Sequence, residues 1–361
     1  MRISTRIRIT ATATVVVFAG AALPASAGTP GLGSPHIIRH LDLAAGQQPE
    51  NLTTEPNGSL DVTMSFARQI VRLTADGGTH VLGTLPAPPN GTDAPLTGRA
   101  FIGGIVRLPD GTLYVLYSAG TADLTGLWRL RPGGVPSRVV PLPASSVPNG
   151  LALHGGYLYA TDSSLGAIWR MAPEGTAAAV WKKAPGLAAR TPSGFGANGL
   201  KIRHNAVWVT TMDKGTLLRV PIGRHGAPGA VHTVAAGLGA VDDFTFTGHG
   251  DDVLAADNAG NRVELVRPDG SHTAVLTAAD GLQNPTSLAR RGETVYVADA
   301  SYYTHTDPNL IAAPVDSWST SRSATTGRAR RNRRQPVPGH GSPHTDRAVI
   351  DLSGEQSTAS G

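Results

Sequence analysis

The chain has 361 residues and no cysteine, so its stability must come from a hydrophobic core rather than from disulfide bonds. Its formal charge of +5 arises at the two ends, because residues 1–8 carry three arginines and no acid, and residues 316–361 carry seven arginines and four acids. The stretch 28–315 holds 21 basic and 22 acidic residues, and this balance excludes the basic face that nucleic-acid binding requires.

The N-terminus has the pattern of a cleavable signal peptide. A basic segment, Met1–Arg8, precedes an apolar run over Ile9–Leu23, and the small residues of Ala25–Ala27 follow. The run is shorter than the roughly 20 residues of a membrane span. We therefore expect residues 1–27 to be removed after Ala27, which would give a secreted protein free of the membrane. An uncleaved N-terminal anchor is the alternative.

Between residues 28 and 315, short strands and Gly- or Pro-containing turns recur in one unit. Each copy has a strand of small and apolar residues, a turn, a strand with aromatic and β-branched residues, a step of small polar residues, and a strand ending on an arginine. Asn149–Asp162 with Gly166–Met171 is one copy, and Asn198–Thr211 with Gly215–Val220 is another. The copies begin at Glu50, Gly103, Asn149, Asn198, Asp242 and about Asn284, a spacing of 42 to 53 residues.

This period is typical of one four-stranded blade per repeat. The sequence therefore predicts an all-β, six-bladed β-propeller over residues 28–315. A β-sandwich is the alternative, but it would not repeat one strand order six times. Residues 29–49 are expected to supply an outer strand that closes the ring beside the last blade, since closure removes an open sheet edge.

Residues 316–361 differ in composition from the rest of the chain. They are rich in Ser, Thr, Gly and Arg and have no apolar period, so we expect a disordered, basic, low-complexity tail. The alternative is a functional arm for anionic cell-wall polymers.

In a propeller, the first residue of each inner strand faces the central channel. These positions are Glu50, Gly103, Asn149, Asn198, Asp242 and one residue within 284–287. Carboxylate and amide oxygens without a thiol suit a hard divalent cation, with Ca²⁺ first, Mg²⁺ or Mn²⁺ next, and Zn²⁺ last because zinc prefers His or Cys. One Asn-Gly pair alone would indicate only a turn. Four polar residues in register across separate repeats favour a metal site.

Several short motifs carry a family resemblance: Pro49-Glu50, Pro148-Asn149-Gly150-Leu151, Ala197-Asn198-Gly199-Leu200, and Asp242-Asp243-Phe244 followed by Ala255-Ala256-Asp257. With these, the chain resembles the family of senescence marker protein (regucalcin), gluconolactonase and luciferin-regenerating enzyme. It resembles paraoxonases and diisopropylfluorophosphatase more distantly.

The resemblance implies a divalent ion held by Glu50, Asn149 and Asp242, with Asn198 as fourth ligand or substrate contact. It also implies that the carboxylate at Asp242 donates or accepts the catalytic proton. Asp243 is adjacent, but Phe244 and Phe246 take the places of Leu151 and Leu153 only when Asp242 faces the channel.

The second blade departs from the family pattern. There the family supplies polar residues that bind substrate, whereas this chain has Arg99-Ala-Phe-Ile-Gly-Gly104, in which only Arg99 could bind substrate. The histidine pair of paraoxonases is also not matched, because His154 and His204 fall past the inner strands.

Two main hypotheses for function follow. The first is a secreted, metal-dependent hydrolase that acts on a lactone or related ester as its small-molecule substrate. The alternative is a non-catalytic propeller that binds a ligand or protein and carries a structural calcium. A third hypothesis, a strictosidine-synthase-like member, lacks a candidate catalytic residue. The sequence contains no Gly-x-Ser-x-Gly, phosphate-loop or His-Glu-x-x-His motif.

Overall fold

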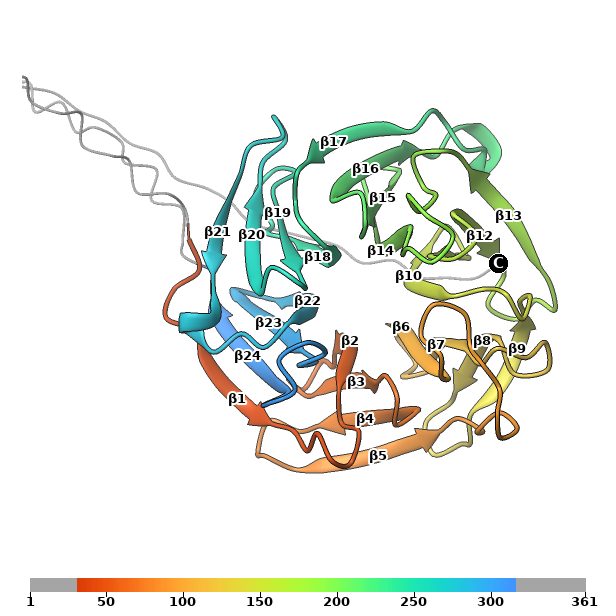
Figure 1. Cartoon of the computed structure of the whole chain (residues 1–361), viewed down its shortest axis with the longest axis horizontal. Helices are drawn as coiled ribbons and strands as arrows, with labels where there is room; N and C mark the ends of the chain where they lie inside the picture. Colours follow the sequence, from red (N-terminus) through yellow and green to blue (C-terminus); the bar gives the residue numbers. More distant parts are fainter. Residues whose placement is uncertain (1–30, 316–361) are drawn as a thin grey trace, which may run out of the picture. The chain divides into compact units, whose positions relative to one another are not determined.

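Each repeat of the sequence folds as one four-stranded antiparallel sheet, and the sheets surround a common axis as six blades (Figure 1). The computed structural model describes residues 31–315. The predicted signal peptide, residues 1–27, and the predicted tail, residues 316–361, lie outside this range. The all-β, six-bladed propeller is confirmed for the part of the chain that the structure describes.

From the innermost strand outward, the first three blades are β2 (Pro49–Thr54), β3 (Leu60–Met64), β4 (Gln69–Leu73) and β5 (Thr79–Thr84); β6 (Phe101–Arg107), β7 (Leu113–Ser118), β8 (Gly126–Leu130) and β9 (Ser137–Pro141); and β10 (Pro148–His154), β11 (Tyr157–Asp162), β12 (Ala167–Met171) and β13 (Ala178–Lys183).

The other three, in the same direction, are β14 (Ala197–Arg203), β15 (Ala206–Thr211), β16 (Thr216–Pro221) and β17 (His232–Ala236); β18 (Val241–Phe246), β19 (Val253–Asp257), β20 (Arg262–Val266) and β21 (His272–Leu276); and β22 (Pro285–Arg291), β23 (Thr294–Asp299), β24 (Asn309–Pro314) and β1 (His36–His40).

The helices within residues 31–315 are two short 3-10 turns, Arg224–Gly226 and Ala278–Asp280. No helix in this range is long and apolar enough to cross a membrane.

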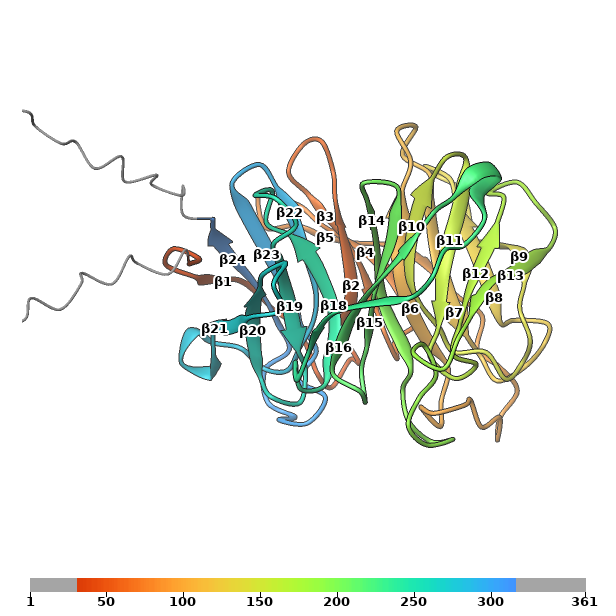
Figure 2. The same ribbon diagram turned by 90° about the horizontal axis from the view of Figure 1, so that it is seen from above.

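The hydrophobic core lies between neighbouring blades, because the apolar residues of each twisted sheet alternate toward the sheets on either side. One cluster joins Ile168 of β12 to Leu200 of β14 and Val209 of β15, all fully buried. The inner strands run along the axis of the ring (Figure 2). Their first residues therefore meet at one end of the channel.

The N-terminal strand β1 closes the ring. It pairs antiparallel with β24, with Ile37 opposite Ile311 and His40 opposite Asn309. The last blade thus combines strands from both ends of the described chain, and the predicted outer strand within residues 29–49 is confirmed.

Candidate functional site

Every inner strand begins with a bulge, and in four of them the bulge sets a candidate residue apart from the ladder. In the third blade Pro148 pairs with Asp162 and Leu151 with Ala160, so Asn149 and Gly150 fall in the irregular step between them. The blades that start with β14 and β18 have the same step, and β2 has a shorter one. Bulges re-aim side chains in this way at many active sites.

Threonines in the second strands hold the bulges of β10 and β14 in place. The hydroxyl of Thr161 accepts a hydrogen bond from the Gly150 amide at 2.8 Å, and Thr210 accepts one from the Gly199 amide at 2.8 Å. Each hydroxyl also donates to a carbonyl at the next blade's bulge, that of Asn198 or Asp242 respectively. The backbones that carry neighbouring candidate residues are thus linked from blade to blade.

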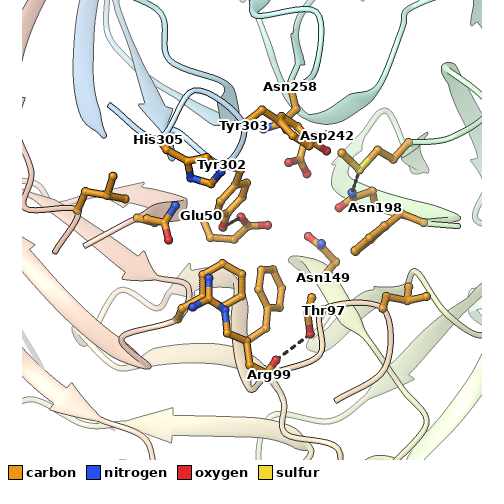
Figure 3. A pocket seen from close by; sticks show the side chains of 17 residues that line it. Glu50, Thr97, Arg99, Asn149, Asn198, Asp242, Asn258, Tyr302, Tyr303 and His305 are labelled. Carbon is orange, nitrogen blue, oxygen red and sulfur yellow. Dashed lines mark hydrogen bonds between the residues drawn. The ribbon is translucent and has the colours of Figure 1, made fainter. Parts of the chain in front are cut away.

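The cavity at this end of the channel has a volume of about 490 Å³. The structure places Glu50, Asn149, Asn198 and Asp242 together in it, from four different blades (Figure 3). All four side chains are buried, with no more than 4% of each residue exposed. The inner-strand positions are thus brought together as expected, and the role of these residues as metal ligands remains a prediction.

The second and sixth blades, which start with β6 and β22, contribute no carboxylate or amide side chain at the level of these four residues. Gly103 occupies the position in β6, and its neighbour Gly104 packs against the backbone of Asn149. Thr286 occupies the position in β22, where its hydroxyl donates to the carbonyl oxygen of Pro49 at 2.9 Å. The cavity floor is therefore polar on four sides only.

The two carboxylates of the cavity strongly affect each other. Burial raises the pKa of Glu50 to about 8, although a hydrogen bond from Tyr302 opposes the rise. Burial and then the nearby charge of Glu50 raise the pKa of Asp242 well above its ordinary value. Neither carboxylate forms an ion pair with any residue in 31–315. Without a bound cation both carboxyls therefore favour their protonated forms, and a cation bound between them would favour the charged forms.

Asp243 lies beneath the cavity rather than in it. Its Oδ2 accepts hydrogen bonds from Lys201 Nζ at 2.6 Å, Ser287 Oγ at 2.7 Å and Asn51 Nδ2 at 3.1 Å. Phe244 pairs with Ala255 as Leu151 pairs with Ala160. The observed register is therefore the one in which Asp242, and not its neighbour, faces the cavity.

The connection 300–308, between β23 and β24, supplies a wall that the sequence did not reveal. The Tyr302 hydroxyl donates to Glu50 Oε2 at 2.6 Å, and burial raises the pKa of this phenol well above its ordinary value. Asn284 Oδ1 anchors the connection because it accepts hydrogen bonds from the backbone amides of Tyr303 and Thr304, each at 2.9 Å. Tyr302, Tyr303 and His305 all line the cavity (Figure 3).

Phe66, Met212 and Asn258 were also not identified from the sequence as cavity residues, although their position in the repeat would have revealed them. Each follows the second strand of its blade, as Tyr302 nearly does. Because the first and second strands are antiparallel, the end of the second lies beside the start of the first. Residues just after the second strand therefore belong to the same cavity.

Arg99 lies in the connection before β6, at the edge of the cavity. Its guanidinium stacks over the Phe66 ring, 3.5 Å from the ring centroid, and the residue is exposed. His154 and His204 do not line this cavity: His154 ends β10 beside Asn205 Oδ1 at 3.1 Å, and His204 follows β14 in a turn.

The donor set fits a hard divalent cation when the amides are included. Within residues 31–315, no three Asp, Glu, His or Cys side chains are grouped to hold an ion by themselves. Asn198 Oδ1, however, is buried without a hydrogen-bond partner, as expected for an oxygen available to a ligand. Glu50 and Asp242 could supply charge, and Asn149 and Asn198 neutral oxygens, a combination typical of Ca²⁺ sites.

No family model matches the chain, and no curated protein matches it. Solved structures resemble it at low identity. A gluconolactonase from Xanthomonas campestris has a TM-score of 0.56 at 16% identity, covering 81% of this chain and 99% of that one. The calcium-binding protein regucalcin from Agrobacterium tumefaciens has a TM-score of 0.57 at 16% identity, covering 77% and 94%.

A virginiamycin B lyase from Staphylococcus aureus has a TM-score of 0.51 at 16% identity, covering 78% of this chain and 99% of that one. Propellers with different activities are thus similar to this chain in fold. At such identities the likeness extends to the fold alone, and any activity must be argued from the site.

Proposed function

We propose that this protein is a secreted, divalent-metal-dependent hydrolase that acts on a lactone or a related ester. The observation that carries the proposal is that the buried side chains of Glu50, Asp242, Asn149 and Asn198 lie together in one cavity, with no Lys or Arg of residues 31–315 paired to either carboxylate. Calcium is the ion that this oxygen set suits best. The fold likeness to a gluconolactonase and to a calcium-binding regucalcin is consistent with this choice.

A divalent cation bound there would polarise the substrate carbonyl and make a nearby water more acidic. Asp242 would accept the proton as the water oxygen adds to the carbonyl carbon. It would return that proton to the leaving oxygen when the ester C–O bond breaks. Tyr302 holds the Glu50 carboxylate by its 2.6 Å hydrogen bond, which fixes the carboxylate's orientation beside the reacting group.

The test is hydrolysis of a panel of lactones and aryl esters by the purified full chain. We expect a chelator to abolish the activity and added Ca²⁺ to restore it. Asp242→Asn should lower kcat by about 10²- to 10⁴-fold, the usual contribution of a general base. The matched control is Asp269→Asn, which should retain activity. Asp269 lies in an exposed outer turn, where its carboxylate accepts a hydrogen bond from the Ser271 amide. Activity that survives both the chelator and Asp242→Asn would contradict the proposal.

The alternative is a non-catalytic propeller that binds a ligand at the same cavity and uses calcium for structure. It is favoured by Gly103, which leaves the second blade without a polar side chain at the level of the ring. Under this alternative, Ca²⁺ would raise the melting temperature while every compound in the panel remained unhydrolysed.

A further inference from the structure

The wall of the cavity next to the first two blades is aromatic. The ring centroids of Phe66 and Phe101 lie 6.1 Å apart, and those of Phe66 and Tyr302 lie 5.6 Å apart, each pair at an interplanar angle of 59°. Phe195 and Met212 line the cavity as well. A flat apolar group placed above the polar floor would therefore meet rings and a thioether.

Three polar side chains around this wall, those of Gln48, Thr97 and Asn258, each donate to a backbone carbonyl. Gln48 Nε2 donates to the carbonyl of Ala300 at 2.9 Å, and the Thr97 hydroxyl donates to the carbonyl of Arg99 at 2.7 Å. Asn258 Nδ2 donates to the carbonyl of Pro285 at 3.0 Å. Along this wall, a polyhydroxylated ligand would recover few of the hydrogen bonds that it makes to water.

Arg99 is the one Lys or Arg among the described residues that line the cavity. It forms no ion pair with any residue in 31–315, and its guanidinium carbon lies over the Phe66 ring. A guanidinium placed in this way presents forked N–H donors that match a carboxylate or another planar anion. Stacking also limits the rotamer entropy that the side chain loses when it binds an anion.

We infer that the substrate has a flat, apolar acyl or aryl body and an anionic group remote from the scissile ester, and that it is not a sugar lactone. The body lies along the wall of Phe66, Phe101 and Tyr302, and the anion meets Arg99 at the rim. The carbonyl then reaches the floor that holds Glu50 and Asp242. This inference rests on the proposed hydrolase activity, which it deepens.

The experiment measures binding and turnover separately on the calcium-supplemented full chain. Calorimetric titration uses three non-hydrolysable probes: 3-phenylpropan-1-ol, its ring-carboxylated analogue 4-(3-hydroxypropyl)benzoate, and sorbitol. Hydrolysis is followed with dihydrocoumarin, 6-carboxydihydrocoumarin and glucono-δ-lactone. The variants are Arg99→Gln, Phe66→Leu and the control Arg131→Gln, whose side chain is exposed beside Glu174 and outside the cavity.

We expect the carboxylated probe to bind about tenfold more tightly than the neutral one, the usual effect of a hydrogen bond to a charged group. Arg99→Gln should abolish this preference and leave the neutral probe unaffected, whereas Phe66→Leu should weaken both aryl probes. Arg131→Gln should change neither.

Sorbitol binding as tightly as the aryl probes, or equal weakening of both aryl probes by Arg99→Gln, would overturn the inference. Preferred hydrolysis of glucono-δ-lactone would overturn it while leaving the hydrolase proposal intact. If the aryl probes bind as expected and no ester is hydrolysed, the ligand class stands and the hydrolase proposal fails.

Discussion

At the scale of single residues, one aspartate position shows how environment changes the chemistry of a repeated side chain. Three blades have an aspartate at the end of the second strand: Asp162, Asp257 and Asp299. Each carboxylate accepts a hydrogen bond from a backbone amide just before the inner strand of the same blade. Asp162 also accepts from the Trp169 indole at 2.9 Å, and Asp257 pairs with Arg262 at 2.9 Å.

Asp299 has no such second partner in the described chain. Its Oδ1 accepts from the Gln283 amide at 2.9 Å, while its Oδ2 is buried without a hydrogen-bond partner. Burial, with a smaller effect of Asp307, raises the pKa of Asp299 to about 8. The folded protein therefore keeps a proton on this carboxyl that the unfolded chain releases near pH 4.

This difference predicts the direction of a pH effect on stability. Because the folded pKa lies above the unfolded one, the contribution of Asp299 is fully present below pH 4 and is lost as pH rises toward 8, by about 1.4 kcal/mol per pH unit. Asp299→Asn should remove that slope. Urea unfolding of both proteins between pH 5 and pH 8 measures it, and parallel curves for the two proteins would refute the assignment.

At the scale of the element, glycines set how closely the inner strands approach one another. The position after the cavity residue is Gly104, Gly150 or Gly199 in three consecutive blades. A Cβ at Gly150 would overlap the backbone nitrogen of Leu200 and lie 2.5 Å from the carbonyl oxygen of Asn198. At the same level in the other blades, Asn51 and Ser287 hydrogen-bond to Asp243.

Gly150→Ala should therefore push apart the strands that carry Asn149 and Asn198. Overpacking of this kind costs about 1 to 3 kcal/mol. Gly186→Ala is the control, because a Cβ there would have its nearest neighbour, Val231 Cγ1, at 3.6 Å. Denaturant unfolding and calcium affinity would be measured for both variants. An unchanged stability for Gly150→Ala would show that the inner strands are not packed this closely.

The inner strands and the residues just after the second strands could be predicted from the repeat, whereas the wall formed by the connection 300–308 could not. Aligning the repeats places Glu50, Asn149, Asn198 and Asp242 at one level because strand register follows the alternation of buried residues such as Leu151 and Leu200. The connection 300–308 has no counterpart of equal length in other blades, so no repeat positions Tyr302. Its place depends on tertiary contacts such as those of Asn284.

At the scale of the whole described ring, closure depends on a short strand from the N-terminal side. Within β1, Ile37 is partly buried against the core that contains Ile311, whereas Ile38 is exposed. The strand covers the edge of β24, which would otherwise be free to pair with another chain.

Ile37→Asp should therefore destabilise the fold by about 2 kcal/mol, since it places a carboxylate against an apolar core without a partner. It should also promote association through the exposed edge of β24. Ile38→Asp, on the opposite face of the same strand, should have little effect. Unfolding curves and size-exclusion chromatography distinguish the two variants, and equal behaviour would contradict the assigned role of β1.

The central claim is that the channel holds a divalent cation on Glu50, Asn149, Asn198 and Asp242. Calcium binding by equilibrium dialysis tests it most directly, with Glu50→Gln compared with the wild-type protein and with Glu293→Gln, whose side chain is 71% exposed. The account predicts about one Ca²⁺ per chain for the wild type and the control, and at least about tenfold weaker binding for Glu50→Gln because a ligand charge is lost. A wild-type protein that binds no Ca²⁺, or a Glu50→Gln variant that binds it equally well, would contradict the claim.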